Sequence, residues 1–392
     1  MKKVKRNSKY YQIVLFVLLS RIILVIVGVI AFTTFTFSSN SYKYNFHYPE
    51  NESKYVLPFK TWDAQHYLFI AKKGYSPNNE SNRFFPLYPF LINTVSRMGI
   101  PLLVSAYGLS MIFSLGSAVV LYKLVMRLFD NAQTATYSVV ALFIYPVSFF
   151  LSLPYTESIF LFISILFFYF LETKKLPLAF LMSLLLPLTR PTGVFIILPL
   201  FLYILCMKKK SYGLSIPTFN KPLLFSLSPI YLCIGFPVIG VMLYFLIMNY
   251  YLGSPFSGIS GLNSISSWNL FGVIDPLSVA KNLFLTKVSL HGFNDSIIDR
   301  LFFIFFMVML PLVYKKMPRH YFFYTLVVGL VPLFGSFTSY TRYLLPAFPI
   351  FIVLAILLQG KNKEYFRVIL IFSCALMQSL FFIMHILNYW VA

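Results

Sequence analysis

Residues 61–89 read TWDAQHYLFIAKKGYSPNNESNRFFPLYP, a long polar interval that separates the first apolar segment of the chain from a nearly unbroken series of others. The interval brings an acid, a histidine, aromatic residues and several cations into a short space. Connecting segments placed on a rigid scaffold often carry function. We therefore expect the active site in this interval.

The composition limits the kind of protein that can surround the interval. The 392 residues are 59% hydrophobic and only 11% charged, and the mean hydropathy is +0.78. A soluble globule cannot cover so much apolar surface, so we predict an all-α, polytopic protein in a lipid bilayer. The net charge of +21 does not indicate a nucleic-acid partner, because the cations lie between hydrophobic runs rather than on one solvated face.

Apolar runs of helix-spanning length predict about eleven transmembrane helices in a single domain covering residues 1–392. Two of the runs are short, so those helices are expected to be tilted, interfacial or merged with a neighbour. The predicted spans are 12–36, 102–126, 133–151, 156–172, 177–189 (short), 191–207, 222–249, 301–314 (short), 320–337, 342–359 and 368–390.

Lysine and arginine residues indicate the orientation. With the N-terminus in the cytoplasm, 19 of them fall on the cytoplasmic side and 12 in the longer outer loops, which favours this topology. The first apolar run is too long for a secretory leader and no small-residue cleavage site follows it, so we interpret it as a retained anchor. Arg21 lies within this run, where its side chain is expected to snorkel to the cytoplasmic edge.

Residues 62–73 of the first outer loop, 37–101, are predicted to form a short interfacial helix. Thr61 suits the N-cap, and Lys72 and Lys73 before Gly74 are typical of a helix end. Helical spacing places Asp63 and His66 on one side. Asp63 falls in the first turn, where the helix dipole favours an ionised carboxylate that can accept a proton. The alternative is that Asp63 only caps the helix or pairs with a lysine.

Acidic residues are scarce: the chain has eleven. Asp63 and Glu157 lie beside apolar, aromatic sequence on the outer side, and Arg190 and Arg342 fall at the outer ends of their spans. We expect these carboxylates and guanidinium groups to converge on one membrane face. An arginine fork there can bind phosphate, or else anchor the helix among lipid head groups.

No pattern indicates a metal or a cofactor. The three cysteines lie in apolar segments without paired spacing, and nucleotide-binding and zinc-protease motifs do not occur. We also find no internal repeat of the kind that builds secondary transporters. The prediction is therefore an enzyme or carrier without metal and without cofactor.

Four blocks of sequence resemble the PIG-V-type mannosyltransferases of glycosylphosphatidylinositol assembly and their prokaryotic relatives. They occur in the order of that family and span most of the chain. The blocks are Trp62-Asp63-Ala64-Gln65-His66 with Phe84-Phe85-Pro86-Leu87-Tyr88-Pro89, Tyr145-Pro146-Val147-Ser148 with Pro154-Tyr155-Thr156-Glu157, Arg190-Pro191-Thr192-Gly193, and Arg342-Tyr343-Leu344-Leu345-Pro346.

The resemblance implies a GT-C glycosyltransferase that moves a hexose, mannose being expected, from a polyprenyl- or dolichyl-phosphate donor on the non-cytoplasmic face. It also implies that Asp63 is catalytic, which agrees with a carboxylate acting as general base on a hydroxyl acceptor. Direct displacement would invert the anomeric centre. The third block departs from eukaryotic members as Arg-Pro-Thr-Gly, so we expect the prokaryotic branch, a plasma-membrane location and a glycolipid, glycan or protein acceptor.

The remaining site residues receive expected roles on this basis. His66 would orient Asp63 or contact the sugar, and Glu157 would bind sugar hydroxyls or pair with Arg190. The later spans, from about 222 onward, would shape the lipid and acceptor sites, with a groove open to the bilayer. The candidates for the donor phosphate are Arg190 and Arg342, with Lys72, Lys73 and Arg83 as rivals, and those for a sugar-stacking surface are Tyr67, Tyr75 and Tyr155, each of which could instead be a core or interfacial residue.

Two other functions fit the composition. A protein O-mannosyltransferase would share the architecture, but that family carries adjacent acids in its first loop, whereas Asp63 has no acidic neighbour. A lipid-linked-sugar flippase or transporter would also be multi-span and basic. A carrier would more often place its charges near the bilayer midplane.

Overall fold

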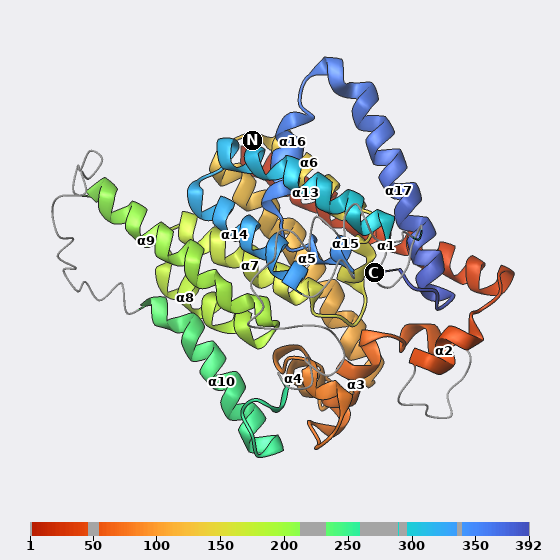
Figure 1. Cartoon of the computed structure of the whole chain (residues 1–392). Helices are drawn as coiled ribbons and strands as arrows, with labels where there is room; N and C mark the ends of the chain where they lie inside the picture. Colours follow the sequence, from red (N-terminus) through yellow and green to blue (C-terminus); the bar gives the residue numbers. More distant parts are fainter. Residues whose placement is uncertain are drawn as a thin grey trace.

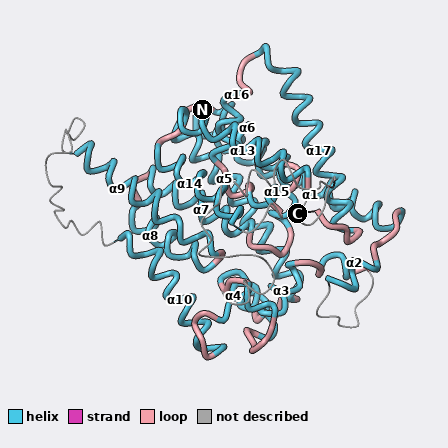
Figure 2. Tube along the Cα trace, in the orientation of Figure 1, coloured by secondary structure: helices cyan, strands magenta, loops and turns pink. Residues whose placement is uncertain are grey.

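The computed structural model describes residues 2–45, 55–211, 233–258, 289, 296–334 and 339–391. Within these ranges almost every residue lies in a helix or a helix-connecting turn, as Figure 2 shows, and the only β pairing is an isolated bridge between Ser289 and Ser296. The prediction of an all-α protein is confirmed.

The described helices vary widely in length. The α-helices are α1 (Lys2–Thr34), α2 (Ser39–Asn45), α3 (Asp63–Lys73), α4 (Leu87–Ser96), α5 (Leu102–Phe129), α6 (Ala132–Ile144), α7 (Glu157–Glu172), α8 (Leu176–Leu185), α9 (Ile197–Ser211), α10 (Gly235–Leu252), α13 (Ile297–Lys316), α14 (Arg319–Leu330), α15 (Tyr340–Tyr343), α16 (Pro349–Leu357) and α17 (Glu364–Ile386), and the short 3-10 turns near the site are η2 (Glu80–Arg83), η3 (Ser148–Ser152), η4 (Leu186–Leu188) and η5 (Pro191–Ile196).

Five of these helices are long and apolar enough to cross a membrane: residues 9–34 of α1, α5, α10, α13 and α17. The other predicted spans contain shorter or broken helices. The span predicted at 133–151 ends at Ile144, shortly before Pro146, and the span at 342–359 is divided around Pro346 and Pro349, because proline lacks the amide hydrogen that continues a helix. The first part of the predicted span 222–249 lies outside the described residues.

The core is a bundle in which α5 packs against both α6 and α7, and α16 packs on α6. In Figure 1, α17 and α1 lie on one side of this group, α8, α9 and α10 lie on the other, and α3 and α4 lie at its lower end. Helix α3 contacts α4 and α5. The first outer loop is therefore packed directly onto the helix ends.

Helix α3 begins and ends almost as predicted. It starts at Asp63 and stops at Gly74, whose positive φ of 79° suits glycine. The predicted cap at Thr61 is wrong, because the cap residue is Trp62 and the Thr61 hydroxyl donates to the Pro58 carbonyl. Leu68, on the side away from Asp63, is also buried, so the packing covers more of α3 than a helix resting on a membrane surface would show.

Arg21 does not snorkel, contrary to prediction. It is buried, and its Nη2 donates to the Ser148 carbonyl (3.0 Å). Gln378 of α17 donates to the carbonyls of Phe143 (3.1 Å) and Tyr145 (3.0 Å). Gln378 of α17 thus bonds carbonyl groups at the end of α6, where helical amides run out, and Arg21 of α1 bonds the first carbonyl of η3.

Candidate active site

Glu157 occupies the first turn of α7 and is completely buried. Its carboxylate forms ion pairs with Arg342, whose Nε lies 3.1 Å from Oε1, and with Arg190 Nη2. A buried carboxylate is stable only when it is paired. Two guanidinium groups provide that pairing here, from parts of the chain that are far apart in sequence.

Arg342, in the short helix α15, also pairs with Asp63. Its Nη2 lies 2.9 Å from Asp63 Oδ2, so one guanidinium group bridges the carboxylates of Asp63 and Glu157. We call Asp63, Glu157, Arg190 and Arg342 the charge cluster. Its members come from α3, from α7, from the junction of η4 and η5, and from α15.

The charge cluster is open to its surroundings at Asp63. The side chain of Asp63 is 28% exposed, against 10% for Arg342 and none for Glu157. Burial raises the pKa of Asp63, but Arg342, Arg83 and His66 lower it by more, so the net pKa lies below the usual value. Asp63 is therefore an accessible, ionised carboxylate at neutral pH.

Asp299 of α13 holds the segment that carries Arg342. Its Oδ1 accepts from the backbone amide of Thr341 (2.7 Å) and from the Thr341 hydroxyl (2.6 Å), and the Tyr145 hydroxyl donates to the Thr341 carbonyl (2.9 Å). Sequence reasoning did not single out Asp299, because it lies in a polar stretch just before the predicted span 301–314.

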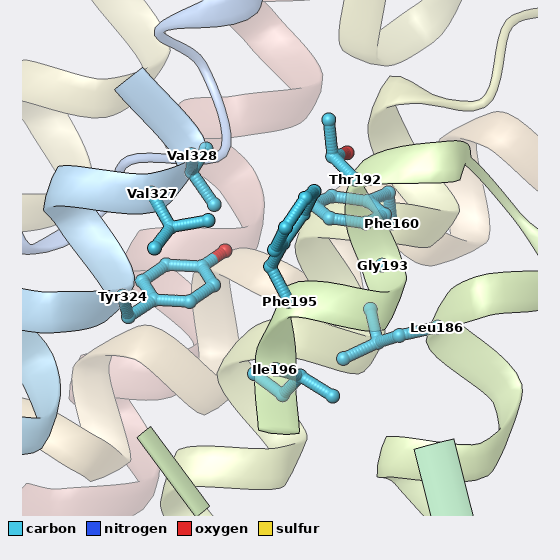
Figure 3. A pocket seen from close by; sticks show the side chains of 9 residues that line it. All are labelled: Phe160, Leu186, Thr192, Gly193, Phe195, Ile196, Tyr324, Val327 and Val328. Atoms are coloured by element: carbon cyan, nitrogen blue, oxygen red, sulfur yellow. The ribbon is translucent and has the colours of Figure 1, made fainter. Parts of the chain in front are cut away.

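Arg190 is held by Thr156, which lies in the second of the four sequence blocks. Its Nε donates to Thr156 Oγ1 (2.8 Å), which also bonds the Tyr67 hydroxyl (3.0 Å). The turn after Arg190 needs glycine, because a Cβ on Gly193 would lie 2.2 Å from the Leu186 carbonyl oxygen. Figure 3 shows Gly193 close to Leu186 beside a small hollow that Tyr324 and Phe195 also line.

His66 and Arg83 lie near Asp63 but outside the charge cluster. His66 is buried, its Nδ1 is 2.9 Å from Ser81 Oγ, and its ring stacks on Phe84. The Arg83 Cζ lies 5.1 Å from the centroid of the same Phe84 ring. Both side chains are close enough to lower the pKa of Asp63.

The two lysines and the three tyrosines named from the sequence are placed differently. Lys72 and Lys73 are exposed at the far end of α3, about 14 Å along the helix axis from Asp63. Tyr155 is buried with its ring 5.5 Å from Arg342 Cζ. The hydroxyl of Tyr67 bonds Thr156 and that of Tyr75 donates to the Phe84 carbonyl.

The fold and the charge cluster together define an integral membrane protein with a carboxylate–guanidinium site at one end of its helices. Glu157 begins α7, and Lys174 and Lys175 follow its other end, about 24 Å away. Residues 8–257, more than half of the chain, match the family described as Mannosyltransferase (PIG-V). The chain belongs to this family.

Two curated relatives match a shorter stretch. The chain is 33% identical over 113 residues to GPI mannosyltransferase 2 of Drosophila pseudoobscura pseudoobscura, covering 26% of this chain and 25% of that protein. It is 31% identical over 113 residues to GPI alpha-1,6-mannosyltransferase 2 of Cricetulus griseus, covering 26% and 23%. The matched stretch thus spans about a quarter of the length of these relatives.

Two solved structures are similar over most of the chain. The Archaeoglobus fulgidus oligosaccharyltransferase superposes with a TM-score of 0.49 and 14% identity, covering 98% of this chain and 56% of that protein. ArnT from Cupriavidus metallidurans, bound to undecaprenyl phosphate, superposes with a TM-score of 0.47 and 11% identity, covering 91% and 64%.

Proposed function

We propose that the protein is a membrane glycosyltransferase that moves a hexose, mannose being expected, from a polyprenyl-phosphate donor to a hydroxyl acceptor. The reaction would take place on the non-cytoplasmic face of a prokaryotic plasma membrane, with inversion at the anomeric carbon. Membership of the PIG-V family supports the reaction type. The observation that carries the assignment of the site is the Arg342 bridge between Asp63, which is accessible, and Glu157, which is buried.

In the proposed reaction the acceptor oxygen attacks the anomeric carbon of the donor. A bond forms between these two atoms, the bond from the anomeric carbon to the phosphate oxygen breaks, and its electron pair leaves with the polyprenyl phosphate. Asp63 takes the proton of the acceptor hydroxyl as general base. The phosphate leaves as an anion, so the site needs cations near it rather than a second carboxylic acid.

The formal charges of the charge cluster cancel, because two carboxylates face two guanidinium groups. Arg83, which acts on Asp63 from outside the cluster, would supply the positive charge that attracts an anionic donor. When the donor phosphate binds, Arg342 would share its fork between phosphate and Asp63. Asp63 would then lose part of the interaction that lowers its pKa, and its carboxylate would become a stronger base in the complex.

An apolar cavity near Arg342 supports a prenyl-linked donor. It has a volume of about 420 Å³ and is lined by α6, α13, α16 and α17. Tyr145 lines it and donates its hydroxyl to the carbonyl of Thr341, the residue before Arg342. A phosphate held at Arg342 would therefore place the first units of its hydrocarbon chain near this cavity. Each methylene buried there would contribute ~0.8 kcal/mol.

The test is transfer and release of polyprenyl phosphate from a radiolabelled polyprenyl-phosphate mannose by the purified protein. Asp63→Asn should lower the rate by about 10²- to 10⁴-fold, the range for loss of a general base, with thermal unfolding showing a folded protein. Arg342→Lys should also lose activity, because a lysine cannot supply the planar fork. An active Asp63→Asn protein would remove the base assignment.

A matched control is Asp130→Asn, the same substitution at an exposed residue at the end of α5, which should leave the rate unchanged. The assay also separates an enzyme from a carrier. A flippase or transporter would move the lipid-linked sugar across vesicles without releasing polyprenyl phosphate. That result would replace the proposed reaction with transport.

A further inference from the structure

The segment that follows α17 closes a ring of contacts around the charge cluster. The Arg342 Cζ lies 5.5 Å from the Tyr155 ring, and the Tyr155 ring lies 6.3 Å from the His385 ring. The backbone N–H of Asn388 donates to the His385 carbonyl (3.0 Å) in the turn that ends α17. We call the set the C-terminal ring; its members are Asp63, Arg342, Tyr155, His385, Asn388, Trp390 and Trp62.

The ring closes through two tryptophans. The Trp62 and Trp390 rings lie 5.4 Å apart in an edge-to-face arrangement, and Trp62 directly precedes Asp63. Both side chains are only partly buried, so the aromatic pair has surface available beside an exposed carboxylate. Residues more than three hundred positions apart thus meet at this point.

Three side chains of the C-terminal ring have buried polar atoms that bond nothing in the described part of the chain. These atoms are the Tyr155 hydroxyl, Trp62 Nε1, and both amide atoms of Asn388, a residue that is 1% exposed. Each such atom costs about 1–3 kcal/mol when it stays unsatisfied. Buried polar atoms of this kind call for a partner, either ordered water or a bound ligand.

The backbone of Trp62 is strained. Its φ of 55° and ψ of −137° lie in a region that residues other than glycine rarely occupy. A large aromatic residue in such a conformation costs of order 1–3 kcal/mol, and such residues cluster at ligand sites. In this conformation the Trp62 ring lies against Trp390 while Asp63 starts the helix.

We propose that the C-terminal ring is a hexose subsite, an inference that rests on the proposed function. Asn388 offers a donor and an acceptor, Tyr155 can act as either, and Trp62 donates, a mixture that matches the hydroxyl groups of a sugar. The two tryptophans offer an apolar surface for the carbon-bound hydrogens of a sugar ring. The hexose belongs either to the lipid-linked donor or to a sugar acceptor.

The variant that tests the hexose subsite most directly is Asn388→Gly. Asn388 has a φ of 63°, which glycine adopts without strain, so the substitution removes the amide and keeps the backbone. The matched control is Asn78→Gly, at an exposed asparagine with a φ of 58°. The measurement is the ratio of kcat/KM for two polyprenyl-phosphate hexoses that differ at one hydroxyl, mannose and glucose.

Asn388→Gly should reduce this ratio by about tenfold, the effect of one lost hydrogen bond to a sugar hydroxyl, while Asn78→Gly leaves it unchanged. If the ratio stays constant, the discriminating hexose is not that of the donor. In that case the KM of a mannosyl acceptor must rise in Asn388→Gly. If the donor ratio and the acceptor KM both match the wild type, the proposal is wrong.

A binding measurement decides the inference even if no transfer is found. Intrinsic tryptophan fluorescence is recorded while polyprenyl-phosphate mannose or bare polyprenyl phosphate is added. The wild type should respond differently to the two lipids, and Trp390→Phe should reduce the difference, with Trp62 and Trp268 present in both proteins. If the wild type responds identically to the two lipids, the hexose subsite is wrong. If the response depends on the sugar but no transfer is found, only the proposed reaction is wrong.

Discussion

Arg342 joins two carboxylates of different character. Glu157 is fully enclosed and pairs with both guanidinium groups, whereas Asp63 has one of these partners and is partly exposed. A buried carboxylate with two cations mainly stabilises the arrangement. An accessible carboxylate with one shared cation can change partners during a reaction. This difference supports the proposed role of Asp63 as proton acceptor and a supporting role for Glu157.

The pH dependence of stability tests the state of Asp63. Its pKa in the folded protein lies below the ordinary 3.8, so the ionised pair stabilises the fold fully above that value and is lost as the pH falls through the lower folded pKa. Thermal unfolding of wild type and Asp63→Asn should differ by a constant amount from pH 8 to about 5 and converge below pH 4.

The expected difference at neutral pH is about 1–2 kcal/mol, less than for a fully buried pair because Asp63 is partly exposed. The exposed Asp130→Asn protein should show no comparable difference. Convergence that already begins near pH 6 would mean that burial dominates over Arg342, and the ionised state of Asp63 would then be refuted.

At the residue scale the sequence predicted some of the site and missed the rest for a clear reason. Asp63, Glu157, Arg190 and Arg342 could be named because acids are scarce and cations stand at the ends of apolar runs. Asp299 and Asn388 could not, because their roles depend on contacts with Thr341 and with the end of α17. Spacing along the chain does not indicate such contacts.

The loop between α6 and α7 shows how neighbouring elements support the site. The loop begins after Ile144, contains η3 and ends at Glu157, the first residue of α7. Arg21 and Gln378 bond the carbonyl groups that the loop leaves open. Helix length could not be predicted here because the apolar run continues through Pro146 into Phe149 and Phe150, which are buried although they are not part of α6.

The turn after Arg190 offers a test at the level of elements. Gly193→Ala would bring a methyl group against the Leu186 carbonyl, a backbone atom that cannot move away easily. The strain should separate η5 from η4, displace Arg190 from Thr156 and Glu157, and lower stability by about 1–3 kcal/mol. Thermal unfolding and the transfer assay would record both effects.

Gly108→Ala is the matched control, since a Cβ there meets nothing within 4 Å and alanine favours the helix by up to ~1 kcal/mol. This protein should be as active as the wild type and equally or more stable. If Gly193→Ala behaved in the same way, close packing of η5 on η4 would have no part in holding Arg190.

For the whole molecule, the sequence predicted an all-α membrane protein, and the described residues agree with this prediction. Five of the described helices are individually long enough to span a bilayer. Others, such as α8 with η4, combine short pieces at prolines. An apolar run predicts which residues are buried in the membrane protein but not where a helix ends, because a proline within the run interrupts the helical hydrogen bonds.

The apolar cavity between α6, α13, α16 and α17 leads to a prediction on donor length. Ala141 lines this cavity, so Ala141→Phe should fill part of it and exclude about two methylene groups, at ~0.8 kcal/mol each. We expect kcat/KM for a long-chain polyprenyl donor to fall about tenfold.

A donor whose prenyl chain is too short to reach Ala141 should react with both proteins alike, because the substitution changes only the part of the cavity beyond its end. Ala141→Val, which adds little volume, is the control for damage to packing. An equal loss for long and short donors would indicate that the substitution distorts the site, and the cavity would then have no role in holding the lipid.

The order in which the charge cluster is translated follows from where its members lie in the sequence. At ribosomal rates of roughly 5–20 residues per second, Arg190 emerges about 2–7 seconds after Glu157, whereas Arg342 emerges about 14–56 seconds after Asp63. A nascent chain stalled in between presents Asp63 without the guanidinium group that neutralises it. Asp63 therefore gains its ion-pair partner only when α15 has been made, so this part of the site forms late in synthesis.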